Sequence, residues 1–128
     1  MDLLTADLRA VLRGNSTARH EAYRLRRTEP DPMPVVKLFN PVSAATWLAT
    51  ELDADDDTLF GLADLGFGCP ELGSFSLREI AALRLPFGLK IERDLAFEGR
   101  LALSRWTETA RREGSIILAE RQILAETT

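Results

Sequence analysis

The stretch TWLATELDADDDTLFGLAD, residues 46–64, predicts two β-strands joined by a tight acidic turn. Residues 46–53 and 58–64 are rich in β-branched, aromatic and other apolar side chains, which favour strands. The run ADDD lies between them, and aspartate is favoured in turns because its short carboxylate accepts hydrogen bonds from nearby backbone N–H groups. We therefore expect an antiparallel hairpin.

The aspartates of this stretch also follow the spacing of a calcium-binding loop. Asp53, Asp55 and Asp57 alternate along the chain, and Asp64 stands at the twelfth position of such a loop. The sixth position, however, requires a glycine and is Thr58, the twelfth is usually glutamate, and the following LGFGCP cannot continue into an exit helix. A turn is the better interpretation, and the sequence predicts no metal site and no cofactor.

The N-terminal part predicts an amphipathic helix followed by a basic arm. Apolar side chains repeat there at the i, i+4, i+7 and i+8 spacing of one helix face: Leu4, Leu8, Val11 and Leu12. Gly14 is expected to end this helix, because glycine tolerates the positive φ of a helix C-terminus. Residues 15–34 mix polar and basic residues with three prolines, so we expect a loop with one helical turn around residues 17–26.

The middle of the chain predicts a strand and a short helix. VVKLFN, residues 35–40, is rich in β-branched and aromatic residues and lies between two prolines, as in a strand. Ser76 and Glu79 form a capping-box pattern. A helix is therefore expected to begin at Ser76 and to end near Leu85, because a proline follows.

The C-terminal part predicts one more strand and two helices. LKIERDLAF, residues 89–97, alternates apolar and polar side chains, which is typical of a strand. LALSRWTETARRE, residues 101–113, has an apolar side and is followed by Gly114, the expected helix stop. Residues 115–128 fit either an edge strand or an amphipathic helix, and we favour the helix.

These elements together predict the fold class. Consecutive strands with short links favour an antiparallel sheet, and helices near both ends of the chain can cover one of its faces. We expect an α+β fold, with a small antiparallel sheet of about four strands and helices packed on one face. A chain of 128 residues is about one domain long. The expected single domain consists of an N-terminal helix and basic arm (1–33), an α+β core (34–98) and a C-terminal helical segment (99–128).

The composition excludes several classes of protein. No apolar run approaches the roughly 20 residues needed to cross a bilayer, and the N-terminus MDLLTADLRAVLR starts acidic, unlike a signal peptide. We therefore expect a cytoplasmic protein that does not contact membranes. Cys69 is the only cysteine and His20 the only histidine, which excludes an internal disulfide and the usual zinc sites.

Charge is distributed unevenly around a net value of −4. Residues 9–27 contain six arginines against Glu21, a balance of +5, and residues 28–98 contain five basic against thirteen acidic residues, a balance of −8. The basic arm therefore either contacts an anionic partner or lies against the acidic part of the chain, and both interpretations stay open. For a nucleic-acid partner the candidate contacts are Arg19, Tyr23, Arg24, Arg26 and Arg27.

Five segments resemble one known family in their order and spacing. They are DPMPVVKLFNP, TWLATELD, LFGLADLG, ELGSFSLREI and LPFGLKIERDLAFE, within roughly residues 3–113. The family that they resemble is a bacterial family of domains of unknown function, the one numbered twenty-nine fifty-eight. The resemblance implies a small stand-alone protein encoded on plasmids or integrative conjugative elements, and it implies no established enzymatic activity.

The candidate ligand-binding residues lie within these segments. Arg93 interrupts an apolar strand face, and a buried arginine needs an acidic partner. Glu51, Asp64 or Glu71 could supply that partner, and Arg93 then forms either a structural ion pair or a contact with a carboxylate or phosphate of a ligand. The full set of candidates is Trp47, Asp64, Glu71, Arg93 and Asp94. No catalytic residue is predicted.

Three functions are compatible with these patterns. The leading hypothesis is a non-enzymatic accessory protein of a bacterial mobile element that binds a protein partner and can also contact nucleic acid. A metal-dependent hydrolase or nuclease is the first alternative, because clustered carboxylates and a lysine could hold and use magnesium. Its residues would be Asp64, Glu71, Glu92, Asp94 and Lys90. The second alternative is an inhibitor of a host defence protein, with the acidic residues 51–57 imitating DNA phosphates. The oligomeric state is left open.

Overall fold

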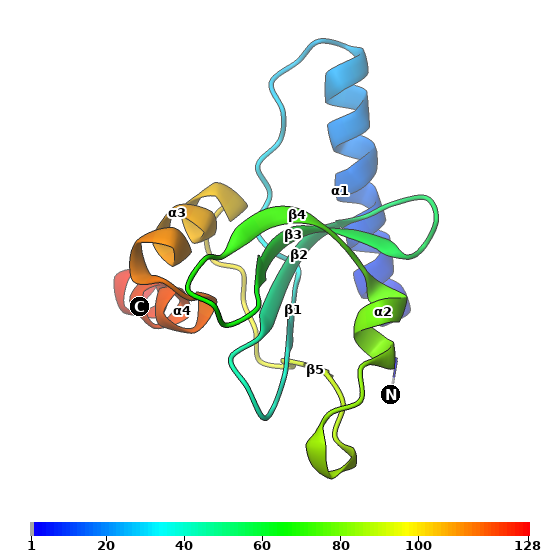
Figure 1. Cartoon of the computed structure of the whole chain (residues 1–128). Helices are drawn as coiled ribbons and strands as arrows, with labels where there is room; N and C mark the ends of the chain where they lie inside the picture. Colours follow the sequence, from blue (N-terminus) through cyan, green and yellow to red (C-terminus); the bar gives the residue numbers. More distant parts are fainter. Residues whose placement is uncertain (1) are drawn as a thin grey trace.

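Residues 2–128, which the computed structural model describes, form an α+β fold around the central hairpin (Figure 1). In chain order the elements are α1 (Ala6–Arg24), β1 (Val36–Phe39), β2 (Thr46–Leu52), β3 (Thr58–Asp64), β4 (Glu71–Ser76), α2 (Leu77–Ala82), the 3₁₀ turn η1 (Pro86–Gly88), β5 (Glu92–Arg93), α3 (Leu103–Glu113) and α4 (Ile116–Thr127). The strands form one antiparallel sheet in the order β4-β3-β2-β1-β5. The α+β class and the antiparallel sheet are therefore confirmed.

The acidic turn between β2 and β3 is confirmed as a tight turn stabilised by its own side chains. Asp53 N donates to Thr58 O at 2.9 Å and closes the hairpin. The carboxylate of Asp55 accepts hydrogen bonds from the hydroxyl and the backbone N–H of Thr58 and from the backbone N–H of Asp57. These bonds, led by that of the Thr58 hydroxyl, lower the pKa of Asp55 to about 2.

Both faces of the sheet are covered, where we expected helices on one face only. Trp47 and Leu59 belong to a buried cluster with residues of α1 and α2, whereas Leu48 and Leu62 belong to a second cluster with residues of α3 and α4. Neighbouring residues of a strand point to opposite faces. The succession of Trp47 and Leu48 therefore places a large apolar side chain on each face of β2, and all seven residues of β2 are buried.

The two edge strands differ from the expectation. β4 was not predicted, because the segment ELGSFS is poor in strand-forming residues, yet all six of its residues pair with β3. The predicted strand at residues 89–97 is wrong except for Glu92 and Arg93, which pair with β1. The chain leaves the sheet after Arg93 because the side chain of Asp94 accepts a hydrogen bond from Ala96 N at 3.0 Å and forms a turn.

Helix α1 is longer than the sequence predicts. It continues well past Gly14, and the loop with one helical turn expected around residues 17–26 is therefore wrong. Contacts with the sheet hold the second half of the helix: Asn15 Nδ2 donates to Thr50 O at 2.9 Å, and Ser16 Oγ donates to a carboxylate oxygen of Asp53 at 3.4 Å. These tertiary contacts outweigh the roughly 1 kcal/mol cost of a glycine inside a helix.

The serine half of the capping box before α2 is confirmed, whereas the Glu79 carboxylate accepts no hydrogen bond from residues 2–128. Ser76 Oγ accepts a hydrogen bond from Glu79 N at 3.1 Å. The carboxylate of Asp57 adds a second cap, because it accepts hydrogen bonds from Arg78 N and Ser76 Oγ, each at 2.8 Å. These bonds, with that of Arg78 N the larger cause, lower the pKa of Asp57. The helix ends at Ala82, slightly earlier than expected.

The predicted helices near the C-terminus are also confirmed. Gly114 follows α3 with a left-handed φ of 87°, as a helix stop requires. Ser115 then caps α4 by accepting a hydrogen bond from Leu118 N at 3.0 Å, so the ambiguous tail is a helix. Each helix in residues 2–128 is too short or too polar to cross a membrane.

We predict that the acid stability of the protein depends on Asp55. The pKa of Asp55 is lowered from 3.8 to about 2 in the folded state, so its contribution to the free energy of unfolding is fully present above pH 3.8 and is lost as the pH falls toward about 2. Asp55→Asn and Thr58→Val should both reduce this loss, and Thr58→Ser should preserve it. Urea unfolding across this pH window measures the effect. Identical pH profiles for wild type and Asp55→Asn would contradict the prediction.

Candidate functional site

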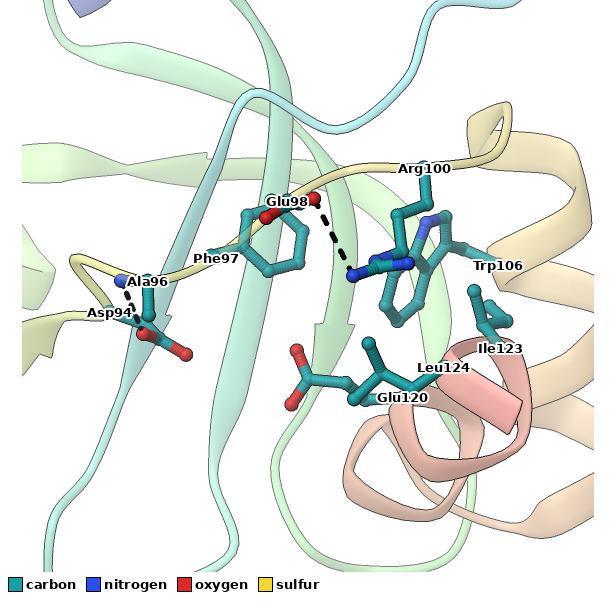
Figure 2. Close-up of a pocket in the computed structure, with 9 residues that line it drawn as sticks. All are labelled: Asp94, Ala96, Phe97, Glu98, Arg100, Trp106, Glu120, Ile123 and Leu124. Atoms are coloured by element: carbon teal, nitrogen blue, oxygen red, sulfur yellow. Dashed lines mark hydrogen bonds and ion pairs between the residues drawn. The ribbon is translucent and has the colours of Figure 1, made fainter. Parts of the chain in front are cut away.

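A small cavity lies between the segment that follows β5 and the last two helices (Figure 2). Its volume is about 200 Å³. We call it the α4 cavity and define it by its lining residues: Asp94, Ala96, Phe97, Glu98, Arg100, Trp106, Glu120, Ile123 and Leu124. Of the five residues predicted to bind a ligand, it contains Asp94 alone.

An aromatic pair forms one side of the α4 cavity. After the turn at Asp94, Phe97 reaches α3, where its ring centroid lies 5.7 Å from that of Trp106 at an interplanar angle of 50°. Trp106 is buried, and its indole N–H donates to Gly99 O at 2.6 Å. Both rings are therefore held in place, and the cavity has a rigid apolar wall.

Lys37 connects three elements next to the α4 cavity, through two residues that line it. Its Nζ lies 2.8 Å from Glu120 Oε1 on α4 and 3.3 Å from a carboxylate oxygen of Asp94 after β5, while Lys37 itself belongs to β1. The side chain of Lys37 is only 13% exposed. A single ammonium group thus pairs with both carboxylates, offsets one of their two negative charges and fixes their orientation.

Arg100 is the least satisfied charged residue of the cavity. One guanidinium nitrogen, Nη1, donates to Thr127 Oγ1 at 3.0 Å, and Nη2 lies 3.5 Å from Glu98 Oε2. The third nitrogen, Nε, is buried and has no hydrogen-bond partner within residues 2–128. Its backbone also has a left-handed φ of 65°, which is uncommon for a residue with a side chain. A buried donor without an acceptor is costly, and in native structures it usually has a cause such as strain, a functional role or a bound water or ion.

Two of the predicted ligand-binding residues serve the core instead. Trp47 is buried among apolar residues that face α1. Asp64 is completely buried, and its two carboxylate oxygens accept hydrogen bonds from Ile116 N and Gly66 N, both at 2.9 Å. A ligand has no access to either side chain in this structure.

Arg93 does not pair with any of the three carboxylates expected for it. Its Nη1 donates to the carbonyl oxygen of Leu3 at 2.6 Å and so holds the N-terminal segment against β5. Glu51 pairs instead with Arg19, at 2.8 and 2.9 Å. Glu71 lies in β4, four strands away from Arg93, or about 19 Å at roughly 4.8 Å per strand. Arg93 and Glu71 therefore cannot contact one small ligand together.

The carboxylates proposed for a hydrolase are also separated. Asp64 is buried at the end of β3, Glu71 lies at one edge of the sheet, and Glu92 and Asp94 lie at the other edge. Among residues 2–128, no three His, Cys, Asp or Glu side chains are grouped in a way that could hold a metal ion. The described residues thus do not provide the arrangement that this alternative requires.

The basic arm divides into two parts. Arg19 lies against the acidic body through Glu51, and this hydrogen bond is the main cause that raises the pKa of Arg19. Beyond it, the end of α1 projects past the sheet (Figure 1), and Tyr23 there is 87% exposed. The remaining predicted contacts, Arg24, Arg26 and Arg27, are exposed as well. The first half of the arm therefore lies against the acidic part of the chain. The second half is exposed and can contact an anionic partner.

Several residues of the α4 cavity were missed by the sequence analysis. They are Phe97, Arg100, Trp106 and Glu120, together with Lys37 next to the cavity. One signal was present, because Lys37 is the only charge in the apolar strand segment VVKLFN, and a charge in such a position needs partners. The sequence around Lys37 does not identify its partners, since Lys37 and Glu120 are 83 residues apart.

We predict that Lys37→Met destabilises the protein by about 1–3 kcal/mol, because it leaves two half-buried carboxylates without their cation. The double variant Lys37→Met with Glu120→Met should recover part of this loss. Lys90→Met, at an exposed lysine, is the matched control and should change the free energy of unfolding by less than about 0.5 kcal/mol. Urea unfolding at neutral pH measures all three variants. Equal stability of Lys37→Met and Lys90→Met would show that the three-way contact contributes nothing.

Comparison with known proteins places the chain in a family. The family described as Protein of unknown function (DUF2958) matches residues 3–117, which is most of the chain. The match agrees with the resemblance seen in the five sequence segments. No curated protein and no solved structure shows significant similarity to the chain. This protein is thus a member of the DUF2958 family.

Proposed function

We propose that the protein is a non-catalytic binding module, a cytoplasmic accessory protein of a bacterial mobile element that recognises a protein partner through the α4 cavity. The observation that carries the proposal is the buried Nε of Arg100, which has no acceptor within residues 2–128. A movement of the Arg100 side chain toward the cavity would let an oxygen atom of a bound partner supply that acceptor and remove the cost of the unpaired donor.

The size of the α4 cavity favours a protein partner over a small molecule. Sites for small molecules usually have volumes of roughly 300–1,000 Å³. The α4 cavity measures about 200 Å³, which is closer to the space that one anchoring side chain occupies. Protein interfaces commonly depend on a few such anchors inserted into well-packed pockets.

The chemistry of the lining indicates which partner residue would fit. Phe97, Ile123 and Leu124 offer apolar surface, and Arg100 offers a hydrogen-bond donor. The carboxylate of Glu98 is 70% exposed at the margin and would repel an acidic side chain. The expected anchor is an apolar side chain whose neighbouring backbone carbonyl accepts a hydrogen bond from Arg100.

The pairing of charges supports a role without catalysis. Lys37 contacts both Asp94 and Glu120, and Arg100 contacts Glu98 and Thr127. A general acid or base has to reach a proton of the substrate. These groups instead contact one another and thereby fix the shape of the cavity.

We predict that peptides selected from a random phage-displayed library on the full chain include a class that requires the α4 cavity. Arg100→Met keeps an unbranched apolar stem but removes the guanidinium donors, and Leu124→Trp fills the cavity. Each should weaken such peptides by about tenfold or more, since a hydrogen bond to a charged group contributes about 1.5–3 kcal/mol. Fluorescence anisotropy with labelled peptides measures the affinities.

Matched controls for this experiment lie on α3 and α4, outside the cavity. Arg111→Met on α3 and Leu118→Trp on α4 change exposed residues outside the cavity and should leave peptide affinity unchanged. Thermal melting of each variant checks that it is folded. Selected peptides that bind the Arg100→Met and Leu124→Trp variants as tightly as wild type would contradict the proposal.

The projecting end of α1 favours a second candidate function, contact with a nucleic-acid backbone. Tyr23 is 87% exposed there, and Arg26 and Arg27 are exposed beside it. Arginines bind phosphates by charge, and an exposed tyrosine can stack on an unpaired base. Arg19 makes no part of this surface because it pairs with Glu51.

We predict salt-dependent binding of a labelled thymidine oligonucleotide through this end of α1. Two phosphate contacts on a single strand give an affinity that falls about sevenfold for a fourfold rise in salt, at a slope of roughly 0.7 per contact. The double variant Arg26→Gln with Arg27→Gln should abolish the binding, and Arg84→Gln with Arg121→Gln should not. Affinity that stays constant as salt rises, or that survives the first double variant, would exclude this surface.

A further inference from the structure

The two edges of the sheet are built in different ways. β5 is only two residues long and both residues are charged, which is a common way to prevent another strand from adding to a sheet. β4 at the opposite edge has six residues in unbroken register with β3 and contains neither proline nor lysine. Monomeric proteins usually protect such an edge, so the open edge of β4 indicates that another strand pairs with it.

The hydrogen-bond pattern identifies the free backbone groups of β4. Leu77 N donates to Asp57 O at 3.0 Å, which fixes the alternation of the β3–β4 ladder. In an antiparallel ladder every second residue bonds to the neighbouring strand and the others point away. Gly73 and Phe75 therefore bond to β3, whereas the N–H and C=O groups of Leu72 and Ser74 point away from the sheet. Within residues 2–128, no other segment donates or accepts hydrogen bonds there.

Gly73 gives an independent indication of a neighbouring backbone. Its partner in β3, Gly61, is required by the fold, because a Cβ atom there would overlap the carbonyl oxygen of Leu48. A Cβ atom at Gly73 would meet nothing within 4 Å, and its φ is not left-handed. Glycine weakens a strand by roughly 0.5–1 kcal/mol. A glycine inside a strand marks a bulge, a tight bend or a place where a ligand or another backbone approaches closely, and the register of β4 with β3 has no bulge.

We propose that β4 pairs antiparallel with β4 of a second copy of the chain, about a two-fold axis at Gly73, to form one continuous sheet of twice five strands. In this register Leu72 of each copy bonds to Ser74 of the other. The two Gly73 residues meet at the narrow position of the ladder, where Cα atoms approach to about 4.5 Å.

The surroundings of β4 fit a copy of the same chain. The free residues Leu72 and Ser74 are placed symmetrically about Gly73, as a two-fold interface requires. Antiparallel pairing also brings the start of one β4, with the exposed Glu71, to the end of the other, from which the 80% exposed Arg78 emerges. Arg78 contacts Asp57 of its own chain at 3.6 Å, and its exposed guanidinium also faces Glu71 of the other copy at each end of the interface.

An apolar loop adds contact area at both ends of this interface. Residues 65–70 precede β4, and within them Leu65 and Phe67 are exposed, Phe67 by 82%. Pairing of the two strands places this loop beside α2 of the second copy. Large exposed apolar side chains next to an open strand edge are typical of an interface. The proposal does not rest on the α4 cavity, whose lining begins just after β5, the strand at the opposite edge of the sheet.

Substitutions at Ser74 test the proposal. Ser74→Pro removes an N–H that points away from the sheet, so the chain itself loses no hydrogen bond, and proline is tolerated in edge strands. Ser74→Lys places a charge of the kind that protects natural edges. Ser74→Val is the matched control, because it keeps the N–H and favours a strand. Far-UV circular dichroism and thermal melting check the fold of each variant.

Sedimentation equilibrium of the full chain gives the result. Wild type and Ser74→Val should sediment at twice the chain mass of 14.2 kDa, and Ser74→Pro and Ser74→Lys at 14.2 kDa. In the wild-type dimer, hydrogen exchange of the Leu72 and Ser74 amides should be slow, and in Ser74→Lys the Leu72 amide should exchange at least tenfold faster. If Ser74→Pro fails to fold, the mass of Ser74→Lys and the exchange data decide whether the chain pairs through β4. A wild-type monomer at all concentrations, or a dimer that survives Ser74→Lys, would overturn the proposal.

Discussion

The buried carboxylate of Asp64 is the contact on which the C-terminal part of the structure depends. It lies at the end of β3 and accepts hydrogen bonds from Ile116 N and Gly66 N, both at 2.9 Å. A buried carboxylate is stable only when donors surround it, and the first turn of a helix has free N–H groups to offer. The bond therefore fixes the start of α4 against the sheet. α4 then carries Glu120 and Ile123 to the cavity, so a residue expected to bind a ligand builds the site instead.

Two local signals, the acidic turn and the start of α2, were read correctly because they depend on bonds between near neighbours. The turn after β2 is stabilised by Asp55 and Thr58, which are three residues apart, and the start of α2 is fixed by Ser76 and Glu79 at the same separation. Features that depend on distant contacts were not predictable. α1 passes Gly14 because its second half is held by the sheet, and β4 is a strand because β3 offers it a full ladder. Weak local preferences yield to such contacts.

The candidate site was predictable only in part, for the same reason. The sequence singled out Asp94, which does line the α4 cavity, and Arg93, which does not. Charged residues in the recurring segments could be recognised as needing partners, but their partners are far away in sequence. Glu51 meets Arg19 across 32 residues and Lys37 meets Glu120 across 83 residues. A single sequence does not show which opposite charge pairs with a given residue, because many acidic or basic residues could serve as its partner equally well.

The positions of the two proposed surfaces on one sheet have a consequence for recognition. The open strand β4 lies at one edge and the lining of the α4 cavity begins just after β5 at the other, so pairing through β4 leaves both cavities exposed. In the paired sheet the two copies of β5 are separated by nine strand spacings, or about 43 Å at roughly 4.8 Å each. A partner that presents two anchors at about this distance gains an effective concentration for the second contact, whereas a partner with one anchor does not. A small cavity that binds a single side chain weakly can in this way select a repetitive or dimeric partner, because affinity then depends on spacing as well as on chemistry.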